Sequence, residues 1–205
     1  MNKVNYQKIL DDIIAGLINQ KKTPSLLLHS CCAPCSSYVL FYLSEYFKVT
    51  VFYYNPNIYP VDEYVKRLNE QKRLIKEMEL KHKIGFEEGD YDKTEFYKHY
   101  KGLENEPERG KRCTICYQLR LEETAKLAKE NGYEYFTSTL TVSPYKDANL
   151  INEIGGQLEN KYDIKYLYSD FKKKEGYKKS IEISNKYKLY RQNYCGCSFS
   201  MRNEK

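Results

Sequence analysis

The sequence of 205 residues lacks the patterns that would place it in a membrane, on a secretory route or in a repeat family. No stretch approaches the roughly 18 apolar residues of a transmembrane helix. The N-terminus has neither the continuous apolar core nor the cleavage site of a signal peptide. No unit of about 20–50 residues repeats, and no low-complexity linker divides the chain. We therefore expect a single cytoplasmic domain over residues 1–205 that does not contact a membrane.

The sequence also contains no tryptophan and neither of the common phosphate-binding loops, G-x-G-x-x-G and Walker A. A nicotinamide or ATP site therefore lacks its usual signature. Hydrophobic residues make up 41% of the chain, which is enough for a core and argues against wholesale disorder. The formal net charge of +6 and the 22 tyrosines permit a nucleic-acid partner without requiring one.

Short β-like runs alternate with helical patterns along the chain. An amphipathic helix over about 1–22 comes first, and its apolar stripe consists of Ile9, Ile13, Ile14, Leu17 and Ile18. Strands are expected at 25–29, 48–55, 84–90, 134–141 and 164–169. Helices are expected at 36–47, 61–80, 92–100, 113–131, 147–154 and 175–187. This alternation predicts an α/β fold with a parallel sheet and right-handed crossovers.

The chemically unusual residues fall at the carboxyl ends of the expected strands, where α/β sheets bind ligands. In chain order these residues are Cys31, Cys32 and Cys35, then 55–57, Asp90, 138–141 and Asp170. This agreement predicts one active site at that end of the sheet.

Seven cysteines in an intracellular chain indicate metal or redox chemistry more often than disulfides. Two Cys-x-x-Cys pairs, Cys32–Cys35 and Cys113–Cys116, lie at expected helix N-termini, where the pKa of a thiol is lowered. Each pair places two thiolates on one metal centre from a single turn, and together they supply four ligands. The spacing fits a structural zinc site as well as an iron–sulfur cluster.

Zinc needs only four ligands, so three cysteines are left over: Cys31, Cys195 and Cys197. They suggest a second metal or a thiol pair beside the first centre, although an exposed C-terminal pair without a role is the alternative. The loop "SCCAPCSS" at residues 30–37 has thiols where related sheets have phosphate-binding glycines. We therefore expect metal, and not ATP, at this turn.

Two segments after the first two strands have more than one interpretation. His29 is either a polar residue that caps the strand end or a partner of a metal ligand. The segment 53–60, "YYNPNIYP", either lines the pocket with amides and aromatic rings or forms an Asn-Pro turn before a helix.

Polar groups further along the chain are equally open. Tyr145 and Lys146 follow the fourth expected strand, and Asp147 beside them could simply cap the next helix. Basic residues occur at 108–113, 172–174 and 178–179. Each group is explained by a solvated face, whereas several around one pocket suggest phosphate contacts.

Five stretches together resemble one family: "HSCCAPCSSYVL" (29–40), "YYNPNIYPVDEYVKR" (53–67), "ERGKRCTICYQLRLEETA" (108–125), "TSTLTVSPYKD" (137–147) and "RQNYCGCSFS" (191–200). They resemble the QueH family, the cobalamin-independent epoxyqueuosine reductases. The match runs from about His29 to the C-terminus and leaves out the helix before Ser25.

The resemblance implies a Rossmann-like fold with helices on both faces, related to ATP-pyrophosphatase-type nucleotide-binding domains. It also implies reduction of epoxyqueuosine to queuosine in the wobble position of tRNA, with a [4Fe–4S] cluster, an adjacent metal ion (iron or zinc) and an unidentified electron donor. The assignment we make gives Cys32, Cys35, Cys113 and Cys116 to the cluster, and Cys31, Cys195 and Cys197 to the second metal. Exchanging Cys31 and Cys32 would keep much of this geometry.

Removal of an epoxide oxygen takes two electrons and two protons, and Tyr145 and Asp90 are the candidate proton donors. Two other classes remain open on the sequence. One is a tRNA-thiolating enzyme, ATP-dependent or ATP-independent, and the other is a zinc-stabilised RNA-binding module that transfers no electrons.

Overall fold

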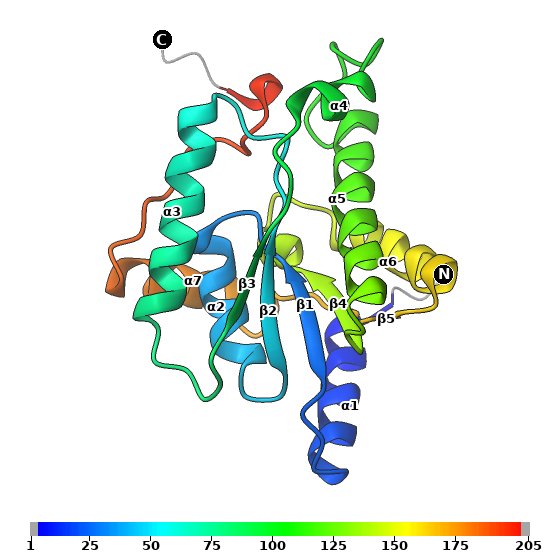
Figure 1. The fold of residues 1–205 in the computed structure, drawn as a ribbon, viewed down its shortest axis with the longest axis vertical. Coiled ribbons are helices and arrows are strands. Elements are labelled where there is room, and N and C mark those ends of the chain that lie inside the picture. Colours follow the sequence, from blue (N-terminus) through cyan, green and yellow to red (C-terminus); the bar gives the residue numbers. More distant parts are fainter. Residues whose placement is uncertain (1–3, 202–205) are drawn as a thin grey trace.

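A five-stranded sheet forms the centre of the computed structural model, which describes residues 4–201 (Figure 1). Its strands are β1 (Ser25–His29), β2 (Lys48–Tyr53), β3 (Gly85–Glu88), β4 (Tyr135–Ser138) and β5 (Lys165–Tyr166). All four strand pairs are parallel, in the order β3-β2-β1-β4-β5. The α/β prediction is therefore confirmed, while residues 1–3 of the expected N-terminal helix and residues 202–205 of the expected domain lie outside the described residues.

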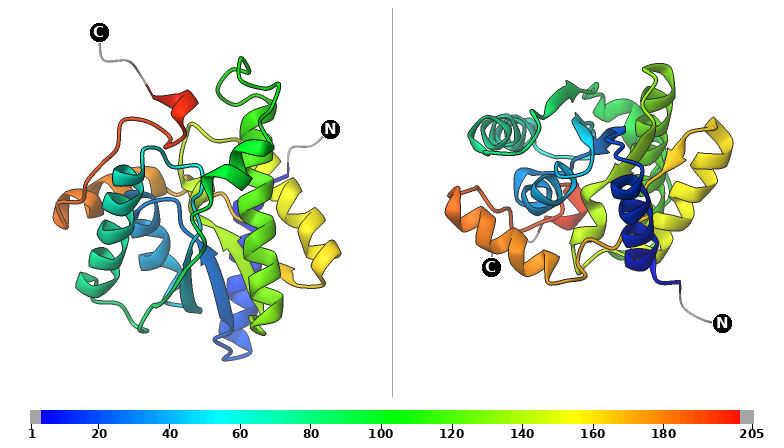
Figure 2. Two further views of the ribbon diagram at one scale, coloured as in Figure 1. Left: turned by 45° about the horizontal axis from the view of Figure 1, so that its top comes forward. Right: turned by 90° about the horizontal axis from the view of Figure 1, so that it is seen from below.

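Helices cover both faces of the sheet (Figures 1 and 2). The helices are α1 (Tyr6–Asn19), α2 (Ala33–Leu43), α3 (Val61–Glu77), α4 (Lys93–Lys98), α5 (Lys111–Glu130), α6 (Ala148–Tyr162) and α7 (Gly176–Lys186). Successive strand side chains point to opposite faces, so Leu26 and Leu28 pack in a core with α1 and α2, whereas Leu27 packs in a core with α5 and α6. The buried sheet thus fixes the loops at its carboxyl end between two packed layers.

Several expected elements differ from the structure. The strand expected at 164–169 consists of Lys165–Tyr166 alone, and the helix expected at 36–47 covers Ala33–Leu43. The strand expected to reach residue 141 ends at Ser138, because Thr139–Val142 turn into a 3-10 helix. The helix expected at 147–154 continues to Tyr162 because Leu158 extends its buried face. The N-terminal helix buries Leu10, Ile14 and Leu17, whereas Ile18 from the predicted stripe is 57% exposed, so the stripe was partly wrong.

The strand order reverses between β1 and β4, since the chain first proceeds from β1 to β2 and β3 and then returns to pair β4 with β1. In doubly wound sheets, ligands bind at this switch point, outside the carboxyl ends of the strands. The C-terminal segment (residues 189–201) crosses above the same end of the sheet (Figure 1). Within residues 4–201, no helix combines the length and the apolar character needed to cross a bilayer.

Candidate metal centre

Three thiols meet in the turn between β1 and α2. The Sγ atoms of Cys31, Cys32 and Cys35, the thiol triad, all lie within 4.8 Å of one another. The distance between the Sγ atoms of Cys31 and Cys32 is 3.8 Å. Four thiolates with metal–sulfur bonds of about 2.3 Å in a tetrahedron are separated by about 3.8 Å. The triad can therefore hold a metal.

The triad is anchored to the ends of the neighbouring strands. The backbone N–H of Cys31 donates to Oγ1 of Thr139, in the 3-10 helix after β4, at 3.4 Å. The Asn55 amide, at the end of β2, donates to the carbonyl of Ser30 at 2.8 Å. The Ser30 hydroxyl in turn donates to Gln71 of α3 at 2.7 Å. Because three elements fix this turn, its thiols have defined positions before any metal binds.

His29 is a strand-end residue and contacts no thiol directly in the hydrogen-bond network. Its Nδ1 lies 2.8 Å from Oγ of Ser138, and its Nε2 lies 3.1 Å from the carbonyl of Tyr54. Burial first, and the positive charge of Arg120 second, lower the pKa of His29 to about 3. His29 is therefore neutral at physiological pH and links β1 to β4 and β2, which agrees with the strand-capping interpretation.

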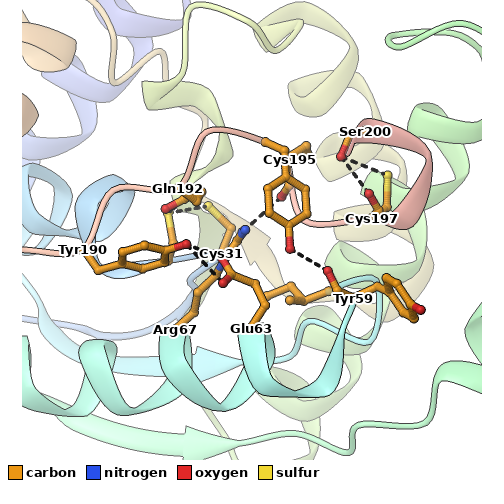
Figure 3. A network of polar contacts seen from close by, with 12 residues as sticks. Cys31, Tyr59, Glu63, Arg67, Tyr190, Gln192, Cys195, Cys197 and Ser200 are labelled. Carbon is orange, nitrogen blue, oxygen red and sulfur yellow. Dashed lines mark hydrogen bonds and ion pairs between the residues drawn. The ribbon is translucent and has the colours of Figure 1, made fainter. Parts of the chain in front are cut away.

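The C-terminal segment brings Cys195 and Cys197 to the same end of the sheet (Figure 3). Its backbone pairs with the loop before α3, since the N–H of Tyr59 donates to the carbonyl of Gly196 at 2.8 Å. Gly196 has φ of 124°, a conformation that favours glycine and allows the sharp turn between the two cysteines. The Gln192 amide of this segment donates to Sγ of Cys32 at 3.0 Å. The segment is thereby tied directly to the thiol triad.

Cys113 and Cys116 lie in the first turns of α5, as predicted. Sγ of Cys113 accepts a hydrogen bond from the backbone N–H of Arg109 at 3.3 Å. The expectation that the helix N-terminus lowers the pKa of these thiols is wrong, because burial raises the pKa of each and the neighbouring Cys195 thiol raises both further. Cys195 therefore lies close enough to both α5 thiols to act on them electrostatically.

Two cations lie among these thiols. Lys146 Nζ donates to Sγ of Cys195 at 3.1 Å. Burial raises the pKa of Cys195, but the positive charges of Lys146 and Arg120 outweigh it, so the pKa lies below its ordinary value. Burial likewise opposes the charge on Lys146, whose pKa is nevertheless raised by Cys195. The two cations thus favour the thiolate form of Cys195, which is the form that binds metal.

Within the triad, Cys31 is the thiol that ionises most readily. Its hydrogen bonds with Cys32 and Cys35 hold the pKa of Cys31 well below its ordinary value. The same hydrogen bonds raise the pKa of Cys32 and Cys35.

A cavity of about 520 Å³ opens beside the thiols. Its size falls within the range of small-molecule sites. Of the candidate ligands, Cys31, Cys35 and Cys195 line it, together with Lys146 and Arg120. The candidate proton donors separate here: Tyr145 lines the cavity, whereas Asp90 is exposed and is not among the lining residues.

The structure decides between the alternatives that the sequence left open for the segment 53–60, for Asp147 and for the basic residues at 172–174. Asn55 is buried and holds the Ser30 carbonyl, so the segment 53–60 supports the site from behind and does not line the cavity. Asp147 caps α6 by accepting from the backbone N–H groups of Asn149 and Leu150. Lys172 and Lys174 are paired with Asp170 and Asp11, which favours a solvated face.

Two residues of the site, the buried Arg120 and the half-buried Gln192, were not identified as candidates in the sequence. Arg120 follows Cys113 and Cys116 by seven and four residues, which places all three on one face of α5. That spacing was a usable signal. Gln192 has no comparable signal, because only the path of the C-terminal segment brings it to Cys32.

The fold and the site together define a class of protein. It is a parallel α/β protein whose switch point carries a cluster of thiols where a phosphate-binding loop would otherwise lie. Sulfur ligands select iron–sulfur clusters, zinc or copper(I), so the class is that of parallel α/β proteins with a thiol cluster able to hold one of these metals.

Comparison with known proteins narrows that class to one family. The family model described as "Epoxyqueuosine reductase QueH" matches residues 26–203. Epoxyqueuosine reductase QueH of Staphylococcus epidermidis is 46% identical over 202 residues, which cover 97% of this chain and 85% of that protein. The Streptococcus pyogenes protein of the same name is 41% identical, covering 98% and 79%. The Thermotoga maritima protein is 36% identical, covering 86% and 90%.

The chain belongs to the QueH family of epoxyqueuosine reductases, which are oxidoreductases of queuosine biosynthesis. The resemblance found in the sequence is thereby confirmed. The alignments with the Staphylococcus epidermidis and Streptococcus pyogenes proteins cover 97–98% of the chain and therefore include most of the N-terminal helix. That helix lies outside the stretches that carry the resemblance in the sequence.

Proposed function

We propose that this protein reduces epoxyqueuosine to queuosine in the wobble position of tRNA. The observation that carries the proposal is that cysteines from two separate segments, Cys31 and Cys35 of the thiol triad and Cys195 of the C-terminal segment, line one cavity at the switch point. In the reaction both C–O bonds of the epoxide break and a C=C bond forms. The oxygen leaves as water after uptake of two electrons and two protons. An electron donor of still unknown identity must supply the electrons.

The cofactors proposed are a [4Fe–4S] cluster and a mononuclear metal, iron or zinc. The donor set fits them, since the chain has seven free cysteines and its triad has metal-like spacing. Cys32, Cys35, Cys113 and Cys116 are proposed to hold the cluster, and Cys31, Cys195 and Cys197 to hold the second metal. When bound, the cluster supplies electrons singly and the second metal supplies Lewis acidity.

One observation favours a different division of the thiols. The triad of Cys31, Cys32 and Cys35 is compact, so these three could serve one centre together and leave the α5 and C-terminal cysteines for the other. In the first division Cys31 and Cys32 are close enough to exchange roles, because their Sγ atoms are 3.8 Å apart.

Protein side chains have two further tasks, orientation and proton delivery. Tyr145 is proposed as the first proton donor, because it lines the cavity, with Asp90 as the alternative. The 3-10 helix after β4 and the C-terminal segment fix two sides of the cavity and limit the orientations of the modified base. A kinship with ATP-pyrophosphatase-type domains is also proposed, supported by a strand order that matches five strands of the doubly wound order.

The substrate class can be tested directly with tRNA that carries epoxyqueuosine. After anaerobic incubation with a chemical reductant, the tRNA is digested and the masses of its nucleosides are measured by mass spectrometry. Loss of one oxygen supports the reductase. Gain of sulfur would indicate a thiolating enzyme instead, and binding without any change of mass would indicate an RNA-binding module.

Binding of tRNA should weaken steeply as salt is raised, because Lys and Arg contacts to phosphates release counterions. Arg109 and Arg191 line the cavity, and both are exposed. We expect Arg109→Gln or Arg191→Gln to reduce the slope of log affinity against log salt by about 0.7 each, the value per phosphate of a single strand. Fluorescence anisotropy at several salt concentrations measures this slope.

The matched control is Lys81→Gln, which removes one positive charge from the loop before β3, at the amino end of the sheet. It should leave the slope unchanged. An affinity that does not depend on salt, or equal slopes in all variants, would mean that tRNA does not bind across this cavity.

A further inference from the structure

Arg120 is an unusual residue because its charge is buried and forms no ion pair with any carboxylate that the structure describes. It is 2% exposed. Its Nε donates to the backbone carbonyl of Cys116 at 3.2 Å, and its Nη1 makes a long contact of 3.5 Å with Oδ1 of Asn55. Its Nη2 has no hydrogen-bond partner among residues 4–201. A guanidinium has five N–H donors, so the network around Arg120 is incomplete.

The comparison with Arg67 shows what is missing. Arg67 is also buried and also faces the C-terminal segment, where it donates to the carbonyl of Cys195 at 3.3 Å. However, Arg67 forms an ion pair with Glu63 at 2.6 Å, as Figure 3 shows. Burying an unpaired charge is strongly unfavourable, so Arg120 requires another anion.

The anions available to Arg120 are sulfur atoms. Burial lowers the pKa of Arg120, but the neighbouring thiols of Cys116, Cys195 and Cys31 outweigh it and raise this pKa above its ordinary value. These cysteines come from three different segments of the chain, and two of them line the same cavity as Arg120. An arginine at this position therefore faces whatever negative charge the thiols and their metals carry.

We propose that Arg120 is the fixed counter-charge of the metal–thiolate centre and raises its reduction potential. This inference rests on the proposed function. Each electron that enters the centre adds one negative charge, and a nearby cation in a low-dielectric site stabilises the reduced form more than the oxidised form. Arginine keeps its charge at every physiological pH, so the effect persists across the working range. Arg120 is thus a positioning residue, which affects the reaction only through the reduction potential of the metal–thiolate centre.

The experiment is an anaerobic redox titration of the metal-loaded protein, followed by visible absorption. We expect Arg120→Gln to make the centre harder to reduce by at least tenfold, which is 59 mV for a one-electron couple. Arg120→Lys should restore most of the wild-type potential because it restores the charge. Lys81→Gln, which removes one positive charge from the exposed loop before β3 at the amino end of the sheet, should not shift the potential.

A second variant tests the inference even if Arg120→Gln does not load metal. Asn55→Asp has the same shape but places a carboxylate beside Nη1 of Arg120, and it also gives up the hydrogen bond to the Ser30 carbonyl. The new ion pair should neutralise the guanidinium and lower the potential in the same direction. Asn55→Ala, which loses that hydrogen bond without adding a charge, is the matched control and should leave the potential unchanged. Unchanged potentials in Arg120→Gln and Asn55→Asp protein would overturn this inference alone. Wild-type protein without a reducible iron chromophore would contradict the proposed function, and this inference with it.

Discussion

Protein carrying Cys113→Ser or Cys116→Ser should be isolated almost colourless, with most of its iron missing. Both side chains belong to the proposed cluster, and a serine oxygen is a poor replacement for a soft thiolate on iron. Some stability should be lost as well, because metal binding is coupled to folding. Iron analysis and the visible spectrum of anaerobically purified protein measure the effect.

Cys195→Ser and Cys197→Ser should behave differently. If these thiols hold the second metal, the cluster should still assemble and the colour should largely remain. Epoxide reduction should nevertheless fail, while tRNA binding is unchanged. All four variants lose one thiol, so general thiol loss cannot explain a difference between the two pairs.

The same set of variants decides between the two divisions of the thiols. Bleached Cys197→Ser protein would contradict the proposed assignment and support a centre shared by the α5 and C-terminal cysteines. Full activity of Cys195→Ser and Cys197→Ser would show that the C-terminal pair has no role in the reaction.

Lys146→Met should lower activity by about 10- to 100-fold, the usual effect of losing a group that orients a metal ligand. The ammonium donates to Sγ of Cys195 at 3.1 Å and helps to hold the pKa of that thiol below its ordinary value, against the effect of burial. Without this charge the pKa of Cys195 rises, so less thiolate is present at neutral pH and the second metal binds more weakly.

The pH dependence supplies the direct measurement. Alkylation of Cys195 in metal-free protein should require a higher pH in Lys146→Met than in the wild type, and Lys146→Arg should restore most of the difference. Lys81→Met is the surface control. Identical alkylation profiles for wild-type and Lys146→Met protein would show that this lysine does not control the thiol.

The part of the site that follows a strand could be predicted, because hydrophobic periodicity locates strands and a parallel sheet gathers their carboxyl ends. Cys31, Cys32 and Cys35 were found in this way, and β1 occupies the expected residues 25–29. The same argument placed Asp90 near the site, yet it lies outside the cavity. The edge position of β3 explains the difference, since β3 is two strands away from the β1–β4 switch point.

The contribution of the C-terminal segment could not be predicted from local pattern. Gln192 reaches Cys32 across 160 residues of sequence, and no periodicity encodes such a contact. Asn55 presents a similar case, because an Asn-Pro turn looks the same whether its amide faces solvent or holds the Ser30 carbonyl. Long-range packing decides both.

The metal and sulfide content of anaerobically purified protein tests the central claim most directly. We expect about four irons with acid-labile sulfide per chain, plus roughly one further metal ion, together with broad visible absorption. Stoichiometric zinc without labile sulfide would contradict it, because a zinc–thiolate site has no electrons to give to an epoxide.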